Sequence, residues 1–283
     1  MHVAAPSPTL VDTYRRGIED LSALALKDLV DLIKSARGGG PEAVKLDLER
    51  YLPLILDQYG VVASDLGAEF YQESRLSAGV TSRFVAEPTP WAVEDGRIVS
   101  LIRWGVSPEY MQSQSTTEML IGGALQRLVL SGFRDSIGEG VVADRSAYGY
   151  ARKPQAGCCA FCAMVSTRVY ESAEVATRVQ GRRSRKRVTD SRGMKSRVET
   201  SFSGTARGTQ GLGDKYHDFC RCTPVPVFDT GGDMWADVAA VNPEAESFLD
   251  AYTKAWGEYA DAGYPGKSQA SEVLKRMRAY GYR

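Results

Sequence analysis

The chain has 283 residues, of which 43% are hydrophobic and 25% charged, and this composition is that of a globular protein large enough to bury a core. Because 35 Lys and Arg residues balance 35 Asp and Glu residues, no overall charge draws the molecule to nucleic acid or anionic lipid, and any such attraction must be local. We see neither a signal peptide nor the ~18 consecutive apolar residues that a membrane span needs.

The first 75 residues predict a helical hairpin. In residues 8–37, apolar side chains recur at helical spacing up to the glycines at 38–40, which favour a helix end. A second apolar series runs from Val44 to Phe70, with Pro41 well placed at its start. We expect Pro53 to kink or split this second helix, because proline removes an interior hydrogen bond.

Residues 76–113 contain several prolines and glycines and predict short helices mixed with loops. The Ser-Thr-Thr-Glu sequence at 115–118 resembles a helix start, and apolar residues follow at helical spacing as far as Ile137. Gly122, Gly123 and Gly132 interrupt this stretch and indicate either close helix contact or a break. Up to residue 145 the chain is therefore predicted to be mostly α.

The character changes after residue 145. We expect a short strand in TRVYES at 167–172 and an edge strand in TPVPVF at 223–228, where proline is tolerated. Residues 178–197 hold nine Arg or Lys residues against the single acid Asp190, and we interpret 178–214 as a long exposed loop. The tail from Pro243 is predicted to be helical, with four aromatic residues on one face: Phe248, Tyr252, Trp256 and Tyr259.

All five cysteines lie in two short windows, GCCAFC at 157–162 and YHDFCRC at 216–222. Zinc prefers four tetrahedral nitrogen or sulfur ligands, and two thiolates spaced as C-x2-C can hold one ion from a tight turn. The candidate ligands are Cys159, Cys162, His217, Cys220 and Cys222. His217 and Cys222 compete for the fourth position, while Cys158 is expected to point elsewhere. Such a closed site would be structural and would join the two ends of the excursion between the windows.

Three other interpretations of the windows stay open. The cysteines could form disulfides between the windows if the mature protein leaves a reducing cytosol. They could also be buried thiols without metal. A catalytic Cys–His pair would need an orienting group and an oxyanion hole, for which no motif is found.

The basic stretch is a candidate for binding DNA. Arg182, Arg183, Arg185, Lys186 and Arg187 would contact phosphates and make the binding sensitive to salt. The alternative is a solvated loop without a ligand. No pattern of a recognition helix supports readout of a base sequence.

YARKPQAGCCAFCAMVSTRVY followed by KYHDFCRCTPVPVF resembles the core of the phage Mu protein F-like minor head proteins in the form found in actinobacterial phages. The resemblance covers about residues 148–228, with Cys159, Cys162, His217, Cys220 and Cys222 as the matching positions. It implies a minor capsid protein of the virion, assembled in the host cytoplasm. Its expected partners are the portal protein, the major capsid protein and packaged DNA, and neither an enzymatic activity nor a membrane is expected.

The predicted fold is thus mostly α. A helical domain spans 1–145, a small α+β core with a zinc-binding Cys/His cluster and a basic arm at 178–214 spans 146–230, and a helical tail spans 231–283. The alternative function is that of a zinc-stabilised, non-specific DNA-binding protein. A further alternative is an enzyme that uses Cys159 or Cys162 with His217. It would be favoured if a Cys→Ser substitution abolished a measurable hydrolytic activity while the metal content stayed unchanged.

Overall fold

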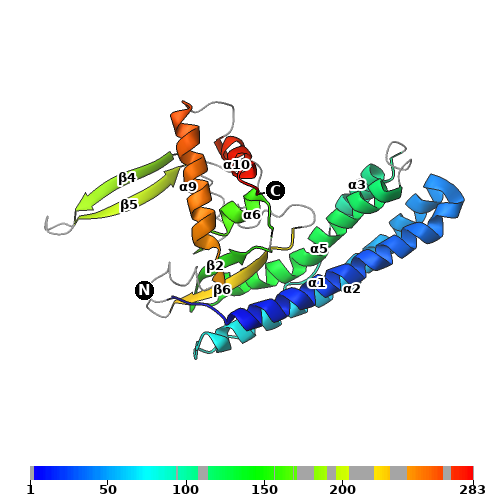
Figure 1. The fold of residues 1–283 in the computed structure, drawn as a ribbon. Coiled ribbons are helices and arrows are strands. Elements are labelled where there is room, and N and C mark those ends of the chain that lie inside the picture. The colour runs from blue at the N-terminus through cyan, green and yellow to red at the C-terminus, as the bar shows by residue number, and fades with distance from the viewer. Residues whose placement is uncertain are drawn as a thin grey trace. The chain divides into compact units, whose positions relative to one another are not determined.

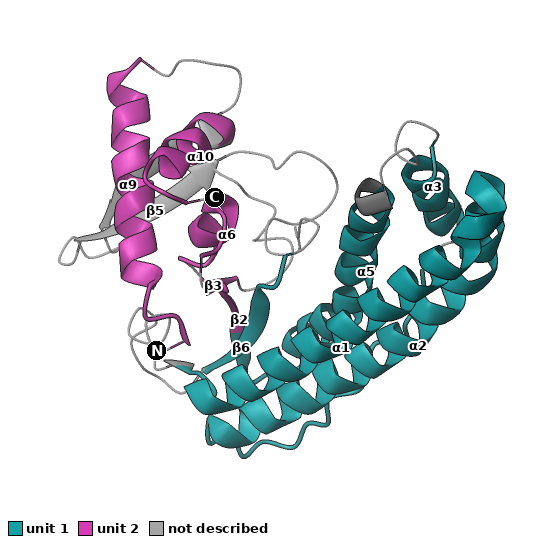
Figure 2. Cartoon of the chain, turned by 45° about the vertical axis from the view of Figure 1, so that its right-hand side comes forward, with its two compact units in different colours: residues 1–148, 216–237 teal, residues 149–215, 238–283 magenta. Residues whose placement is uncertain are grey.

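A computed structural model of the chain describes residues 3–93, 95–107, 114–155, 157–167, 169–170, 182–189, 196–203, 220–229, 241–263 and 269–282. The fold is mostly helical with a small sheet, as the sequence predicts (Figure 1). The chain divides into two compact units, residues 1–148 with 216–237 and residues 149–215 with 238–283 (Figure 2). The three domains expected from the sequence stay a prediction.

The predicted helical hairpin is confirmed as α1 (Pro8–Ala36) and α2 (Gly40–Ser77), joined by the 3-10 turn Arg37–Gly39. Ser7 begins α1, because its side chain accepts a hydrogen bond from the backbone NH of Leu10 at 3.3 Å. The helix α2 runs through Pro53 without a split. Leu52 and Leu56, which flank the proline, are fully buried, and their packing offsets the hydrogen bond that proline removes.

The third long helix, α5 (Gln114–Ala143), packs against both α1 and α2, and the short helix α3 (Asp95–Gly105) packs against α2 and α5. Glycines set how closely α2 and α5 approach. A Cβ added at Gly132 would lie 2.6 Å from the carbonyl oxygen of Gly60 and 2.7 Å from Oγ of Ser64. The sequence left open whether the glycines of this stretch allow close helix contact or break the helix. At Gly132 the two helices are in close contact, and α5 is continuous there.

A buried polar network joins the end of α2 to the end of α5. The guanidinium of Arg75 forms an ion pair with Asp144, and Tyr71 donates a hydrogen bond to the same carboxylate at 3.1 Å. A second nitrogen of Arg75 donates to the carbonyl oxygen of Ser82 at 2.6 Å. Burial raises the pKa of Tyr71 well above its usual range, so its hydroxyl stays protonated and acts as a donor.

Four strands form one sheet in the order β1-β6-β2-β3. Their bounds are Val3–Ala4 for β1, Ala147–Lys153 for β2, Val169–Tyr170 for β3 and Thr223–Asp229 for β6. The short strand expected near 167–172 is present as β3. The expectation that β6 is an edge strand is wrong, since β6 lies between β1 and β2. Its prolines are tolerated because β1 pairs only with Phe228 and Asp229, beyond Pro224 and Pro226.

Within the predicted basic loop, the structure has two antiparallel strands, β4 (Arg182–Thr189) and β5 (Ser196–Ser203), seen side by side in Figure 1. Position 186, a lysine, pairs with position 199, a glutamate, and Arg187 pairs with Val198. The composition of 178–197 suggested a loop because it has few apolar residues. The two strands are joined by backbone pairing along their whole length, which depends little on apolar side chains.

The predicted helical tail is confirmed as α9 (Ala245–Asp261) and α10 (Gln269–Ala279), which pack against each other and against the short helix α6 (Ala160–Val165). Phe248 and Tyr259 are buried, as their helical spacing predicts, and Trp256 lies 5.8 Å from the ring of Tyr259, centre to centre.

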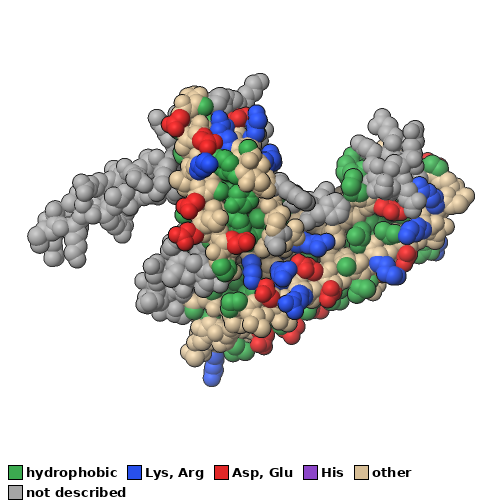
Figure 3. Space-filling model, in the orientation of Figure 1, with side chains coloured by type: hydrophobic (Ala, Val, Ile, Leu, Met, Phe, Trp, Pro, Cys, Tyr) green, Lys and Arg blue, Asp and Glu red, His purple; other side chains and the backbone are tan. Residues whose placement is uncertain are grey.

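No helix within the described ranges is long and apolar enough to cross a membrane. On the face drawn in Figure 3, basic and acidic side chains of the described residues are interspersed along the helices. This mixture matches the equal numbers of positive and negative residues in the chain.

Candidate metal centre

Cys220 and Cys222 stand directly before β6. Successive residues of an extended chain point to opposite sides, so the first and third residues of Cys-Arg-Cys share one side. Their burial follows this alternation: Cys220 is 2% exposed and Cys222 is 3% exposed, while Arg221 between them is exposed. The spacing of one residue therefore directs both thiols inward.

Cys162 comes from the other window, in the first turn of α6. Cys159 is the N-cap of this helix, and its sulfur accepts a hydrogen bond from the backbone NH of Cys162 at 3.4 Å. Cys162 is 2% exposed, whereas Cys159 is only partly buried. This hydrogen bond fixes Cys159 at the start of the helix and places Cys162 in its first turn.

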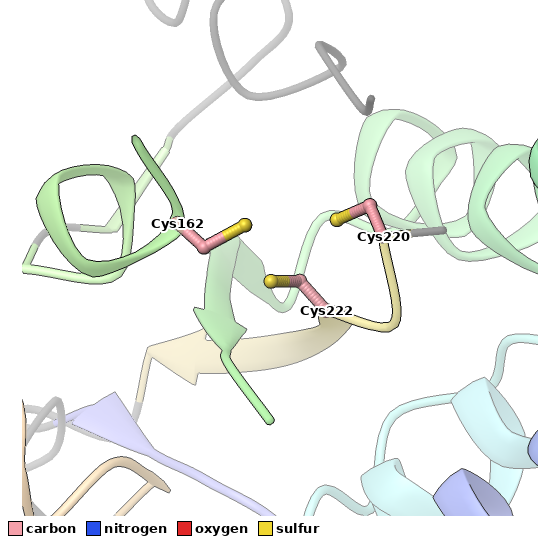
Figure 4. Close-up of side chains that lie close together, drawn as sticks. All are labelled: Cys162, Cys220 and Cys222. Atoms are coloured by element: carbon pink, nitrogen blue, oxygen red, sulfur yellow. The ribbon is translucent and has the colours of Figure 1, made fainter. Parts of the chain in front are cut away.

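The fold brings these two windows together. The Sγ atoms of Cys162, Cys220 and Cys222 all lie within 4.8 Å of one another, and Figure 4 shows the three side chains directed towards a common point. In a tetrahedral site with Zn–S bonds of ~2.3 Å, neighbouring sulfurs are about 3.8 Å apart. Separations of up to 4.8 Å are thus compatible with one ion between the three sulfurs.

The donor set could hold a metal ion. Three buried sulfurs around one point satisfy three positions of a tetrahedron, and zinc needs one more nitrogen or sulfur ligand. Cys159, three residues before Cys162, is one candidate, and His217 is the other. His217 lies outside the described residues.

Arg134 in α5 holds the backbone of the second window. One of its terminal nitrogens donates hydrogen bonds to the carbonyl oxygens of Cys220 at 2.7 Å and of Cys222 at 3.2 Å. Arg134 is only 7% exposed, so these hydrogen bonds are buried and hold the backbone on both sides of Arg221 in place.

Sequence reasoning missed Arg134. A signal was present, because the arginine stands between Leu130 and Ile137, at i+4 and i+7 of a helical stripe whose other members are apolar. A charged residue in such a stripe requires a buried partner. Here the partners are two backbone carbonyls of a segment 86 and 88 residues away, which no local pattern reveals.

A small pocket adjoins the site on the side of α1 and α5. Its lining includes Glu19, Arg134, Arg221, Cys222 and Thr223, and its volume is about 20 Å³. The space that water can occupy there is about the size of one water molecule.

The remaining predicted residues have different positions. Cys158, expected to point elsewhere, is buried beside the N-cap and does not belong to the group of three. The five predicted DNA-binding residues, Arg182, Arg183, Arg185, Lys186 and Arg187, all fall in strand β4. Alternate residues of a strand occupy opposite faces, so positions 183, 185 and 187 share one face and positions 182 and 186 share the other.

Comparison with known proteins identifies one family. The family model described as VG15 protein matches residues 5–255. The match takes in the three long helices, both cysteine windows, the basic strands and most of α9. Neither the search of curated proteins nor the search of solved structures found a match.

Proposed function

Since this chain belongs to the VG15 protein family, a family of viral (phage) gene products, we propose that it is a minor capsid protein of the bacteriophage head. In this proposal the chain is a structural component at the portal vertex or inside the capsid. It assists head assembly and the packaging or delivery of the genome. Its partners are the portal protein, the major capsid protein, or both.

The match over residues 5–255 carries the proposal, because it assigns most of the chain to a phage family. The narrower role is supported by the two cysteine windows, on which the resemblance to Mu F-like minor head proteins rests. Windows that are far apart in the sequence contribute Cys162, Cys220 and Cys222 to one buried cluster. The resemblance requires both windows to belong to one structural unit, and this cluster supports that requirement.

We further propose that the cluster holds one structural Zn²⁺ per chain. Cys162, Cys220 and Cys222 would supply three ligands, with either Cys159 or His217 as the fourth. When bound, the ion would join α6 to the start of β6 and so stabilise the ends of the segment between the windows. The thiols would serve as ligands and not as nucleophiles, and we expect no catalytic activity.

Packaged DNA is proposed as a non-specific partner. Strand β4 carries five basic residues among its eight positions, and a ribbon of two strands has a width that fits the major groove of duplex DNA. The same observation favours the alternative function, a zinc-stabilised DNA-binding protein that acts outside the particle. The two functions differ in where the protein is found.

Quantitative mass spectrometry of purified particles tests the proposal. In phage-infected cells, the protein is measured in procapsids, in DNA-filled heads and in the particle-free lysate, with the portal protein as the internal standard. We expect a constant, low ratio to the portal in both kinds of particle. Absence from both, with DNA bound by the protein in the lysate, would reject the capsid role and favour the alternative.

A phage that lacks the gene gives a second readout. We expect fewer infectious particles, and packaged heads that are defective in assembly or delivery. Complementation with the wild-type chain and with a Cys162→Ser variant separates the need for the protein from the need for the cysteine site.

A further inference from the structure

The helix α2 has an apolar strip on its solvent side. One side of α2 packs against α1 and α5, where Leu52 and Leu56 are fully buried. On the opposite side, Leu54 is 60% exposed and Val61 is 49% exposed. Tyr51 and Val62 are exposed beside them. These four residues form what we call the α2 strip.

The members of the α2 strip are aligned along the helix. Leu54 and Val61 are seven residues apart, which is about two turns, and Tyr51 and Val62 are eleven residues apart, which is about three turns. Each pair therefore follows the helix axis, and the strip is about 17 Å long at 1.5 Å per residue. An apolar row of this length on one helix face is the shape that a second helix covers.

Opposite charges stand at the two ends of the strip. Arg50 precedes Leu54 by four residues, and Asp65 follows Val61 by four residues. Both side chains are exposed, and the guanidinium of Arg50 lies 5.3 Å from the ring centre of Tyr51. The strip thus has a positive end and a negative end at equal distances from its middle, where the exposed Asp57 and Gln58 lie.

We propose that the α2 strip is a contact surface between two copies of this chain, with α2 of one copy antiparallel to α2 of the other. A two-fold axis between residues 57 and 58 sets Leu54 against Val61 of the second copy, and the reverse contact follows by symmetry. The same axis sets Arg50 opposite Asp65 of the second copy. Tyr51 comes beside Val62 of the second copy, on the same flank.

The charges select this arrangement. A parallel pair in register would set Arg50 against Arg50 and Asp65 against Asp65. An antiparallel shift that sets Leu54 against Gln58 would bring Asp47 against Asp65, and a shift the other way would set Leu54 against Asp65. Of these arrangements, the proposed one combines apolar contact with opposite charges at both ends, and it sets Asp57 opposite Gln58 of the second copy.

One helix face is small beside the ~800 Å² per partner of a standard interface, so we expect weak association, with a dissociation constant in the micromolar range. Sedimentation velocity of the full chain over a hundredfold range of concentration measures it. Leu54→Glu places a charge in the middle of the strip and should weaken the dimer at least tenfold. Leu24→Glu is the matched control, because Leu24 is an equally exposed leucine (53%) on α1 and lies outside the strip.

Charge exchange tests the register. Arg50→Glu and Asp65→Arg should each weaken the dimer several-fold, because each sets like charges opposite each other, and the double variant should restore the wild-type value within threefold. Thermal unfolding of every variant, with Leu54→Gln as a milder replacement, shows that the fold is kept. A chain that is monomeric at all concentrations, a dimer insensitive to Leu54→Glu, or a double variant without rescue would overturn the proposal.

Discussion

The guanidinium of Arg134 donates a hydrogen bond to the carbonyl oxygen of Cys220 at 2.7 Å, and so connects the middle of α5 to the second cysteine window. The same nitrogen reaches the carbonyl oxygen of Cys222 at 3.2 Å. A long helix of the bundle thereby fixes the backbone that directs two thiols to one point. The cysteine site is thus supported by residues that lie outside both windows.

Replacing Arg134 by methionine should destabilise the protein and weaken metal retention. The substitution keeps an unbranched side chain but leaves two buried carbonyls without their donor, at a cost of about 1–3 kcal/mol each. Loss of an orienting partner typically lowers metal affinity by about 10- to 100-fold. Urea unfolding and competition with a chromogenic chelator measure the two effects. Arg145→Met, at an exposed position, is the control, and equal behaviour of both variants would contradict the assigned role.

Asp144→Ala should be among the most destabilising substitutions in the long-helix bundle. It leaves the guanidinium of Arg75, which is 1% exposed, without its counter-charge and removes the acceptor of Tyr71. Breaking a buried ion pair in this way costs about 3–5 kcal/mol. Asp31→Ala breaks the exposed pair between Asp31 and Lys27 and should leave the midpoint of urea unfolding nearly unchanged. Similar shifts for the two variants would show that the buried network contributes little.

Gly132→Ala should separate α2 from α5. The added methyl would lie 2.6 Å from a backbone oxygen of Gly60, which cannot move without distorting α2, so we expect a clear fall in melting temperature. Gly138→Ala, in the same helix, meets nothing within 4 Å and should stabilise the helix by up to about 1 kcal/mol. A lower melting temperature for Gly132→Ala together with a higher one for Gly138→Ala would confirm the close contact. A neutral Gly132→Ala would refute it.

The register of β4 and β5 predicts that the two faces of the ribbon differ in DNA binding. Positions 183, 185 and 187 are arginines, and the register pairs them with positions 202, 200 and 198, none of which is acidic in the sequence. The other face has Arg182, Lys186 and Arg197, with Glu199 opposite Lys186. The unopposed row of three arginines should make most of the phosphate contacts.

Two variants with equal loss of charge test this prediction, Arg183→Gln/Arg185→Gln/Arg187→Gln and Arg182→Gln/Lys186→Gln/Arg197→Gln. Fluorescence anisotropy with a duplex oligonucleotide at several salt concentrations gives the affinity and its salt slope. The first variant should lose about 0.9 in slope for each lost phosphate contact, and the second should change less. Equal losses would mean that only the overall charge of the ribbon matters, and unchanged binding would exclude the ribbon as the DNA site.

The helices were predictable because their signals are local. The apolar spacing in 8–37 and 44–70 and the aromatic face of 243–260 each depend on residues three or four positions apart. Leu29, Leu52 and Phe70 of these series are buried, whereas Leu24 and Val62 are exposed, so the spacing predicted the helices better than it predicted which side faces the core. Features that depend on distant residues were not predictable. Pro53 stays within α2, a helix that packs against both α1 and α5, and β6 is an inner strand because residues 3–4 pair with its far end.

The cysteine site likewise has features that local sequence spacing predicts and features that depend on distant residues. The spacing of C-x2-C and C-x-C indicated which residues could be ligands, and the structure brings Cys162, Cys220 and Cys222 together. Sequence spacing cannot show that Cys162 and not Cys159 lies in the group of three, because this depends on how α6 is turned about its axis. Nor can it show Arg134, whose partners are backbone atoms of a distant segment.

The measurement that tests the central claim most directly is the metal content of the purified full chain. Inductively coupled plasma mass spectrometry of the wild type, Cys162→Ser and the neighbouring control Cys158→Ser should give about one zinc per chain for the wild type and the control, and none for Cys162→Ser. The variants Cys159→Ser and His217→Ala then identify the fourth ligand, since only one of them should lose the ion. A wild-type chain without zinc, or a Cys162→Ser variant that keeps it, would contradict the proposed metal centre.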